Sequence, residues 1–222
     1  MKSYEEACGL ARGLDVVGER WTLLVIRELL FGPKRFTDLE DGMPGVPPSL
    51  LSTRLKELAD AGLIQQRILP PPAASTVYEL THAGRQLEES LVALAKWGAR
   101  FGRPMTKDDQ VRAEWMALGM KWLFKPEEAA GVRATYEMRY EDQVLTAVVD
   151  DGRVQIEVGT ATDPDLTVEM LDTEAGRQML VGEIPAPTAA SHEFIGVTGS
   201  VEAMERFLRI FALPPIDVAT AR

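Results

Sequence analysis

The order of the predicted elements in residues 8–80 leaves few folds open to this chain. Two apolar-periodic helical stretches end at Gly32 and Pro33, and a brief helix, a turn at residues 43–47 and an amphipathic helix ended by Gly62 follow. Next come two runs rich in β-forming residues, at 63–69 and 75–80, separated by the proline-built stretch 70–74. Helices, a turn, another helix and a hairpin in this order predict a winged helix-turn-helix domain, a fold that usually binds DNA.

The amphipathic helix after the turn carries most of the candidate DNA contacts. One side repeats apolar residues at helical spacing and is expected to pack inward: Leu51, Leu55, Leu58 and Ala61. Short hydroxyl side chains and a lysine are expected outside: Ser49, Ser52, Thr53 and Lys56, with Arg54 beside the hydroxyls as a further candidate DNA contact. Short hydroxyls beside cations suit a helix in a major groove, where phosphates flank the base edges. A merely solvated face explains the same pattern equally well.

Charge is distributed unevenly along the chain. Residues 1–105 hold 13 basic and 13 acidic side chains, whereas the remainder holds 11 basic and 21 acidic ones, which gives the whole chain its net charge of −10. Phosphate repulsion argues against nucleic-acid contact by the acidic part, so two domains are predicted, 1–104 and 105–222. DNA contact by the neutral first part must depend on local placement of basic and hydroxyl side chains, among which Arg35, Arg67 and Ser75 are further candidates.

Several classes of protein are not expected from this sequence. It holds no apolar run long enough to span a membrane and no signal peptide, which predicts a cytoplasmic protein without a membrane partner. It also lacks a glycine-rich phosphate loop, a nucleophile elbow and paired metal ligands. We therefore expect no catalytic residues, no metal, no cofactor and no enzymatic activity.

A helix over residues 82–102, capped by Thr81, is predicted to carry one broad apolar stripe. The stripe contains Leu87, Leu91, Leu94, Trp97 and Phe101. Such a helix packs against its own domain, against a symmetry mate, or against both. We expect a homodimer formed through the N-terminal helix and residues 82–102.

The second part of the chain is predicted to be an α+β domain with an antiparallel sheet. A helix at 109–124 precedes strands at 131–140, 143–149 and 153–158, which are joined by tight turns. A strand at 166–170, a helix at 173–181, a strand at 194–197 and a helix at 200–211 complete it. The whole chain is thus placed in the α+β class.

Methionine and tryptophan side chains in this part are candidates for an adaptable apolar pocket. They are Trp115, Met116, Met120, Trp122, Met138, Met170 and Met179. An ordinary hydrophobic core explains the same stripe, so the residues alone do not establish a ligand site.

The single cysteine, Cys8, is a candidate redox site. With no second cysteine in the chain, its only disulfide partner would be its copy in a dimer, and the nearby Lys2 and Arg12 are expected to lower its pKa. An inert, buried thiol is the alternative.

Residues 8–30, the segment Gly32 to Phe36 and the run Leu51-Ser-Thr-Arg-Leu-Lys-Glu-Leu resemble the HxlR family of bacterial transcription regulators. The resemblance spans about residues 6–101. It implies a homodimeric winged helix in which the helix after the turn enters the major groove and the hairpin approaches the flanking backbone or minor groove. Family members usually have a polar cap where this chain has Pro47 and Pro48, and an arginine near the end of the wing, where it has residues 74–76.

The second part resembles the sterol carrier protein fold, chiefly in its Val-Thr-Gly segment at 197–199 and the apolar terminal helix that follows. That resemblance implies a tunnel for apolar ligands. The predicted function is a homodimeric, DNA-binding transcription regulator that senses an apolar small molecule through its C-terminal domain. The alternatives are a hydrophobic-ligand carrier whose winged helix serves for dimerisation, and a thiol redox sensor acting through Cys8.

Overall fold

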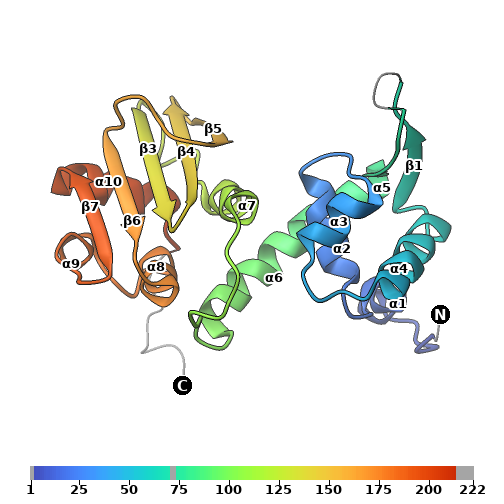
Figure 1. Ribbon diagram of the computed structural model, residues 1–222. Helices are drawn as coiled ribbons and strands as arrows, with labels where there is room; N and C mark the ends of the chain where they lie inside the picture. Colours follow the sequence, from blue (N-terminus) through green and yellow to red (C-terminus); the bar gives the residue numbers. More distant parts are fainter. Residues whose placement is uncertain (1–2, 71–73, 214–222) are drawn as a thin grey trace. The chain divides into compact units, whose positions relative to one another are not determined.

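A computed structural model describes residues 3–70 and 74–213, and they form two compact units, Met1–Ala95 and Lys96–Arg222 (Figure 1). The boundary between the two units lies inside helix α6 (Glu88–Phe101), before the boundary at residue 104 that the sequence predicted. Assignment of DNA binding to residues 1–104 and ligand binding to residues 105–222 stays a prediction. Among the described residues, no helix is long and apolar enough to cross a membrane.

The first unit has the predicted order of helices followed by a hairpin. Its elements are α1 (Gly9–Val17), α2 (Thr22–Leu30), α3 (Phe36–Gly42), α4 (Pro48–Asp60), β1 (Ile64–Ile68), β2 (Thr76–Leu80), α5 (His82–Arg85) and the start of α6. The two strands pair antiparallel with Ile64 opposite Leu80, which confirms the predicted hairpin. Residues 71–73 of the proline-built tip lie outside the described residues.

Two expectations for this unit were wrong in detail. Ala61, expected in the apolar stripe, is exposed, because α4 ends at Asp60 and Gly62 takes a left-handed conformation with φ of 71°. The single helix expected over 82–102 is two helices, α5 and α6. Thr81 does cap the first of them, where its side chain accepts a hydrogen bond from the Gly84 N–H.

The second unit is an α+β domain built on a five-stranded sheet. It contains α7 (Ala113–Leu123), β3 (Arg133–Tyr140), β4 (Gln143–Asp150), β5 (Arg153–Val158), β6 (Leu166–Met170), α8 (Thr173–Leu180), α9 (Ala186–Ala189), β7 (Ile195–Gly199) and α10 (Val201–Phe211). The strand order is β5-β4-β3-β6-β7. The short helix α9 has no counterpart in the sequence prediction.

The sheet is mixed, which corrects the prediction that it would be antiparallel. Strands β3, β4 and β5 form the expected meander, but β6 pairs parallel to β3 with Tyr136 opposite Leu166. Asp165 fixes the start of β6 there, because its backbone N–H donates to the Thr135 carbonyl and its carboxylate accepts from the Thr135 N–H, both at 2.8 Å. Since β4 already lies on the other side of β3, β6 takes the open edge after a crossover from β5.

One face of the sheet supports the hydrophobic core of the second unit. Alternate side chains of β3 point into it, and the buried Tyr136 contacts Phe207 and Phe211 of α10 at ring distances of 5.4 and 5.9 Å. Met120 of α7 and Met179 of α8 join the same core. Helices α7, α8 and α10 therefore pack on one face of the sheet (Figure 1). Residues of α7 and α8 line the cavity described below.

Candidate functional site

The exposed side of α4 carries short polar side chains and one lysine. Ser49, Ser52, Thr53 and Lys56 are all exposed, while Leu51, Leu55 and Leu58 are buried beneath them. Pro47 is the N-cap residue of α4, with φ of −65°, and Pro48 is the first residue of the helix, a position that proline favours. Thr53 donates its hydroxyl to the Ser49 carbonyl at 2.9 Å, so its oxygen still accepts. The outer face of α4 is thus narrow in the sense that its exposed side chains, apart from Lys56, are short, as the sequence predicted.

Arg54 is not on this face, contrary to the sequence prediction. Its side chain is only 11% exposed and pairs with Glu19 at 3.0 Å and with Glu57. It also donates to the Arg20 carbonyl at 3.2 Å. Position 54 lies three residues after Leu51 and four before Leu58, on the inward side of the helix. Arg54 therefore holds α4 against the segment that precedes α2.

The remaining candidate DNA contacts differ in how available they are. Arg67 is exposed, but its guanidinium pairs with Glu79 of the opposite strand at 3.0 Å, and Ser75 is half-buried. Arg35 is exposed at the start of α3. In the part of the chain that the structure describes, neither Arg35 nor Lys56 forms an ion pair. These two side chains are consequently the best placed of the candidates to meet phosphates.

Cys8 lies at the N-terminal end of α1, where its thiol is exposed. The backbone N–H groups of Ala11 and Leu10 lower the pKa of the thiol, because they donate hydrogen bonds to its thiolate. The sequence prediction assigned that effect to Arg12 and Lys2. Lys2 lies outside the described residues, and the helix backbone is the cause that the structure gives.

We expect the folded protein to react with iodoacetamide at a lower pH than an ordinary thiol does. A lowered pKa leaves more thiolate at neutral pH, and the thiolate is the nucleophile. The measurement is the alkylation rate against pH in the folded protein and again in denaturant, where the helix is absent. Since Cys8 is the only cysteine in the sequence, the measured alkylation rate is that of its thiol alone. If the alkylation rate rose with the same pH midpoint in the folded protein and in denaturant, the prediction would be contradicted.

A cavity of about 300 Å³ lies within the second unit. Five residues of α7 on one helical face line it: Trp115, Met116, Gly119, Met120 and Leu123. Residues of α8 at helical spacing line another side: Thr173, Gly176, Arg177 and Leu180. Met138 and Tyr140 of β3, Met170 of β6, and residues 99, 105, 110–112, 181 and 213 complete the lining. The lining is overwhelmingly apolar, as is typical of small-molecule sites.

The structure brings together five of the seven side chains that the sequence put forward as ligand contacts. Trp115, Met116, Met120, Met138 and Met170 line the cavity. Trp122 and Met179 do not. Met179 lies on the core side of α8 and is fully buried, and Trp122 falls off the lining face of α7. Composition alone did not separate these faces, whereas the spacing of positions 115, 116, 119 and 123 would have done so.

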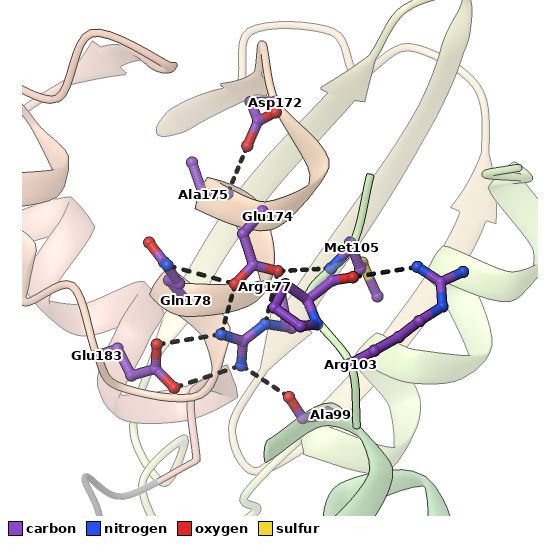
Figure 2. A network of polar contacts seen from close by, with 10 residues as sticks. Ala99, Arg103, Met105, Asp172, Glu174, Ala175, Arg177, Gln178 and Glu183 are labelled. Atoms are coloured by element: carbon purple, nitrogen blue, oxygen red, sulfur yellow. Dashed lines mark hydrogen bonds and ion pairs between the residues drawn. The ribbon is translucent and has the colours of Figure 1, made fainter. Parts of the chain in front are cut away.

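Arg177 is the centre of a polar network at the edge of the cavity, shown in Figure 2. Its Nε and Nη2 donate to Glu174 at 2.9 and 2.7 Å, and Nη1 donates to the Ala99 carbonyl at 2.8 Å. Glu183 accepts from Nη1 and Nη2 at 3.3 and 3.1 Å. Glu174 also accepts from the Met105 N–H at 2.8 Å. All five guanidinium hydrogens are thus used, and the network holds both ends of residues 99–105.

The network predicts a specific dependence of stability on pH. Arg177 lowers the pKa of Glu174 by donating hydrogen bonds to its carboxylate. A carboxyl group with a lowered folded-state pKa stabilises the fold above its unfolded pKa of about 4.3, and this contribution is lost as the pH falls through the folded value. We expect Arg177→Met to reduce this loss of unfolding free energy on acidification below about pH 4.

Denaturant titrations at a series of pH values test this expectation. Glu174→Gln is the matched control, because it removes the titrating group itself and should flatten the acid dependence in the same way. If both variants kept the acid dependence of the original chain, Glu174 would not be its source.

The sequence prediction did not include Arg177 or Thr173 in the site. An arginine flanked by Glu174 and Glu183 resembles an ordinary solvated helix face, and only the fold shows that it borders a cavity. Among the residues that the structure describes, no group of three or more histidine, cysteine or carboxylate side chains is arranged to hold a metal ion.

Comparison with known proteins concerns the first part of the chain. A family model described as HxlR-like helix-turn-helix matches residues 16–106. The HTH-type transcriptional regulator YodB of Bacillus subtilis is 32% identical over 90 residues, which cover 40% of this chain and 80% of YodB. The chain belongs to the HxlR-like helix-turn-helix family.

Other relatives match over a similar length. YvaP of Bacillus subtilis, an uncharacterized HTH-type transcriptional regulator, is 31% identical over 108 residues, 49% of this chain and 100% of YvaP. An uncharacterized HTH-type transcriptional regulator of Mycobacterium bovis is 40% identical over 96 residues, so this chain spans 60% of its length. The solved reduced form of YodB is similar with a TM-score of 0.40 at 28% identity, over 46% of this chain and all of YodB. The HxlR-like match ends at residue 106, so it does not support the likeness of the second unit to sterol carrier proteins.

Proposed function

We propose that this protein is a DNA-binding transcription regulator whose second unit binds an apolar small molecule. The observation that carries DNA binding is the narrow exposed side of α4, with Lys56 among short hydroxyls, in a chain of the HxlR-like family. Side chains of this size let a helix approach base edges, while lysine pairs with phosphate. The relatives of this part of the chain are named as transcriptional regulators.

A homodimer is part of this proposal. Leu94, Trp97 and Phe101 of α6 are 52, 58 and 59% exposed, and Leu10 of α1 is 72% exposed. Large apolar side chains at such exposure mark an association surface, and equivalent patches on two copies can pair by two-fold symmetry. A dimer would present two α4 helices to half-sites about one helical turn of DNA apart.

The cavity supports the effector-binding part of the proposal, and the resemblance to the sterol carrier fold points to an apolar ligand. Ala99 and Met105 line the cavity, and both are held by the network of Arg177 and Glu174. Ala99 belongs to the last turns of α6, a helix that begins at Glu88 in the first unit. A ligand that displaces residues 99–105 would therefore move the end of α6 and alter the spacing of the two α4 helices.

Binding to DNA from just upstream of the protein's own coding region tests the proposal. We expect tight binding that weakens steeply between low and moderate salt, since each neutralised phosphate releases counterions. Absence of binding even at low salt would contradict DNA binding and favour a carrier of hydrophobic ligands, with the winged helix serving for dimerisation.

A second candidate function is thiol sensing through Cys8. It is favoured by one observation, an exposed thiol whose pKa is lowered at the start of α1. Treatment with diamide followed by electrophoresis without reductant should give a covalent dimer that Cys8→Ser abolishes. A monomer band after treatment would contradict this function.

A further inference from the structure

Thr173 lines the cavity and has a buried hydroxyl without a hydrogen bond to any described residue. The residue is 7% exposed and lines the cavity at the first position of α8. Its Oγ1 atom is buried, and none of the described residues offers it a hydrogen bond. Burying a hydroxyl without a partner costs about 1–3 kcal/mol, so such groups usually have a partner in the working state. Because Thr173 lines the cavity, a molecule bound there can supply this partner.

The charged groups around the cavity disfavour an ionised ligand. Arg177 uses all its donors on Glu174, Glu183 and the Ala99 carbonyl, so two carboxylates face one guanidinium. Arg112, the other cation in the lining, pairs with Glu114 at 3.4 Å. A ligand carboxylate would find no unpaired cation there and would lose its hydration in an apolar space.

The size of the cavity indicates how large a ligand body it can enclose. One water occupies about 30 Å³ in the liquid, so a space of about 300 Å³ accommodates about ten water-sized groups. The methionine side chains in the lining adapt to the shape of what they enclose. A compact molecule of roughly ten non-hydrogen atoms therefore fits the space.

We propose that the cavity takes an uncharged, compact apolar molecule with one hydroxyl or carbonyl oxygen, and that this oxygen exchanges a hydrogen bond with Thr173 Oγ1. The proposal rests on the proposed function of the second unit as a ligand-binding domain and names the chemical class of its ligand. The threonine hydroxyl both donates and accepts, so it suits either kind of oxygen.

Three ring compounds of similar shape test the proposal on the full chain: 2-naphthol, naphthalene and 2-naphthoate. Binding is followed by NMR of carbon-13 methyl-labelled methionines, because Met116, Met138 and Met170 line the cavity and report where each compound lies. We expect 2-naphthol to bind about tenfold more tightly than naphthalene, since one hydrogen bond is worth about a factor of ten. Binding of 2-naphthoate should be weakest.

Thr173→Val removes the hydroxyl and keeps the branched shape. It should abolish the preference for 2-naphthol over naphthalene and leave naphthalene binding unchanged. Thr22→Val is the matched control, because Thr22 is also the first residue of a helix, is 2% exposed, and has a hydroxyl without a hydrogen bond among the described residues. Thr22 does not line the cavity, so its variant should keep the preference.

Three outcomes would overturn the proposal: equal binding of 2-naphthol and naphthalene, a preference that survives Thr173→Val, or tighter binding of 2-naphthoate. Failure of all three compounds to shift the cavity methionines would overturn it as well. Regulation is measured separately as the effect of 2-naphthol on DNA affinity. Binding at Thr173 without such an effect would contradict effector control and leave the assignment of the ligand class intact.

Discussion

Replacing Lys56 with glutamate is expected to lower the affinity for DNA by about tenfold for each subunit, and so by about 100-fold if the protein binds as the proposed homodimer. Lys56 is exposed on α4 and forms no ion pair with any described residue, so its ammonium is available to a phosphate. The variant removes one attraction per subunit and adds a repulsion. Because the side chain is exposed, the free energy of unfolding should change by less than about 0.5 kcal/mol.

The dependence of affinity on salt distinguishes lost phosphate contact from other effects. With Lys56→Ala, the slope of log affinity against log salt should fall by about one for each subunit. Lys107→Glu is the matched control, since it makes the same charge change at an exposed position in the acidic second unit. If the control weakened binding as much as Lys56→Glu, the effect would come from net charge and α4 would not be the reading helix.

Arg54→Met should behave differently from Lys56→Glu. Arg54 is largely buried and joins Glu19 and Glu57, so its loss leaves two carboxylates without their cation. We expect the free energy of unfolding to fall by about 2 kcal/mol, with any loss of DNA binding following from the weakened fold. The two residues lie two positions apart in the sequence, yet only one of them faces the solvent.

Arg54 and Lys56 show which side-chain positions in the first unit could be predicted from the sequence. Helical spacing gave the positions of Leu51, Leu55 and Leu58 correctly. It also placed position 54 on the inward side, but the positive charge of arginine led to the opposite prediction. A long side chain can bury its stem and pair its head with carboxylates from another segment, as Arg54 does with Glu19. That pairing depends on the tertiary fold, which local spacing does not specify.

Prediction of the second unit from the sequence was limited in a similar way. Alternating residues and tight turns predicted the three-stranded meander and the strand Leu166–Met170. The pattern of a strand is the same whichever direction it runs, so the parallel pairing of β6 with β3 was not readable from it. The cavity is less predictable still, because Gly119 and Thr173 become neighbours of one space only after α7 and α8 pack on the same sheet face.

Replacing Gly119 with phenylalanine is expected to lower ligand affinity by about 100-fold or more, because the new ring occupies space that the ligand needs. Gly119 lies on the cavity-lining face of α7, within the helix and midway between Trp115 and Leu123. A Cβ atom at this position meets no other atom within 4 Å, so a larger side chain has room to enter the cavity. Binding of 2-naphthol to the variant, followed by calorimetry, is the measurement.

Gly119→Ala separates cavity filling from an effect on the helix. Alanine adds one carbon, should leave 2-naphthol affinity within about threefold, and should stabilise α7 by up to about 1 kcal/mol through its greater helix propensity. Tight 2-naphthol binding by Gly119→Phe would place the ligand elsewhere. If Gly119→Phe lost 2-naphthol binding and kept its affinity for DNA, while DNA binding by the original chain responded to 2-naphthol, then the cavity would be the effector site. We would then expect the signal to pass through residues 99–105, which include the part of the lining that belongs to α6.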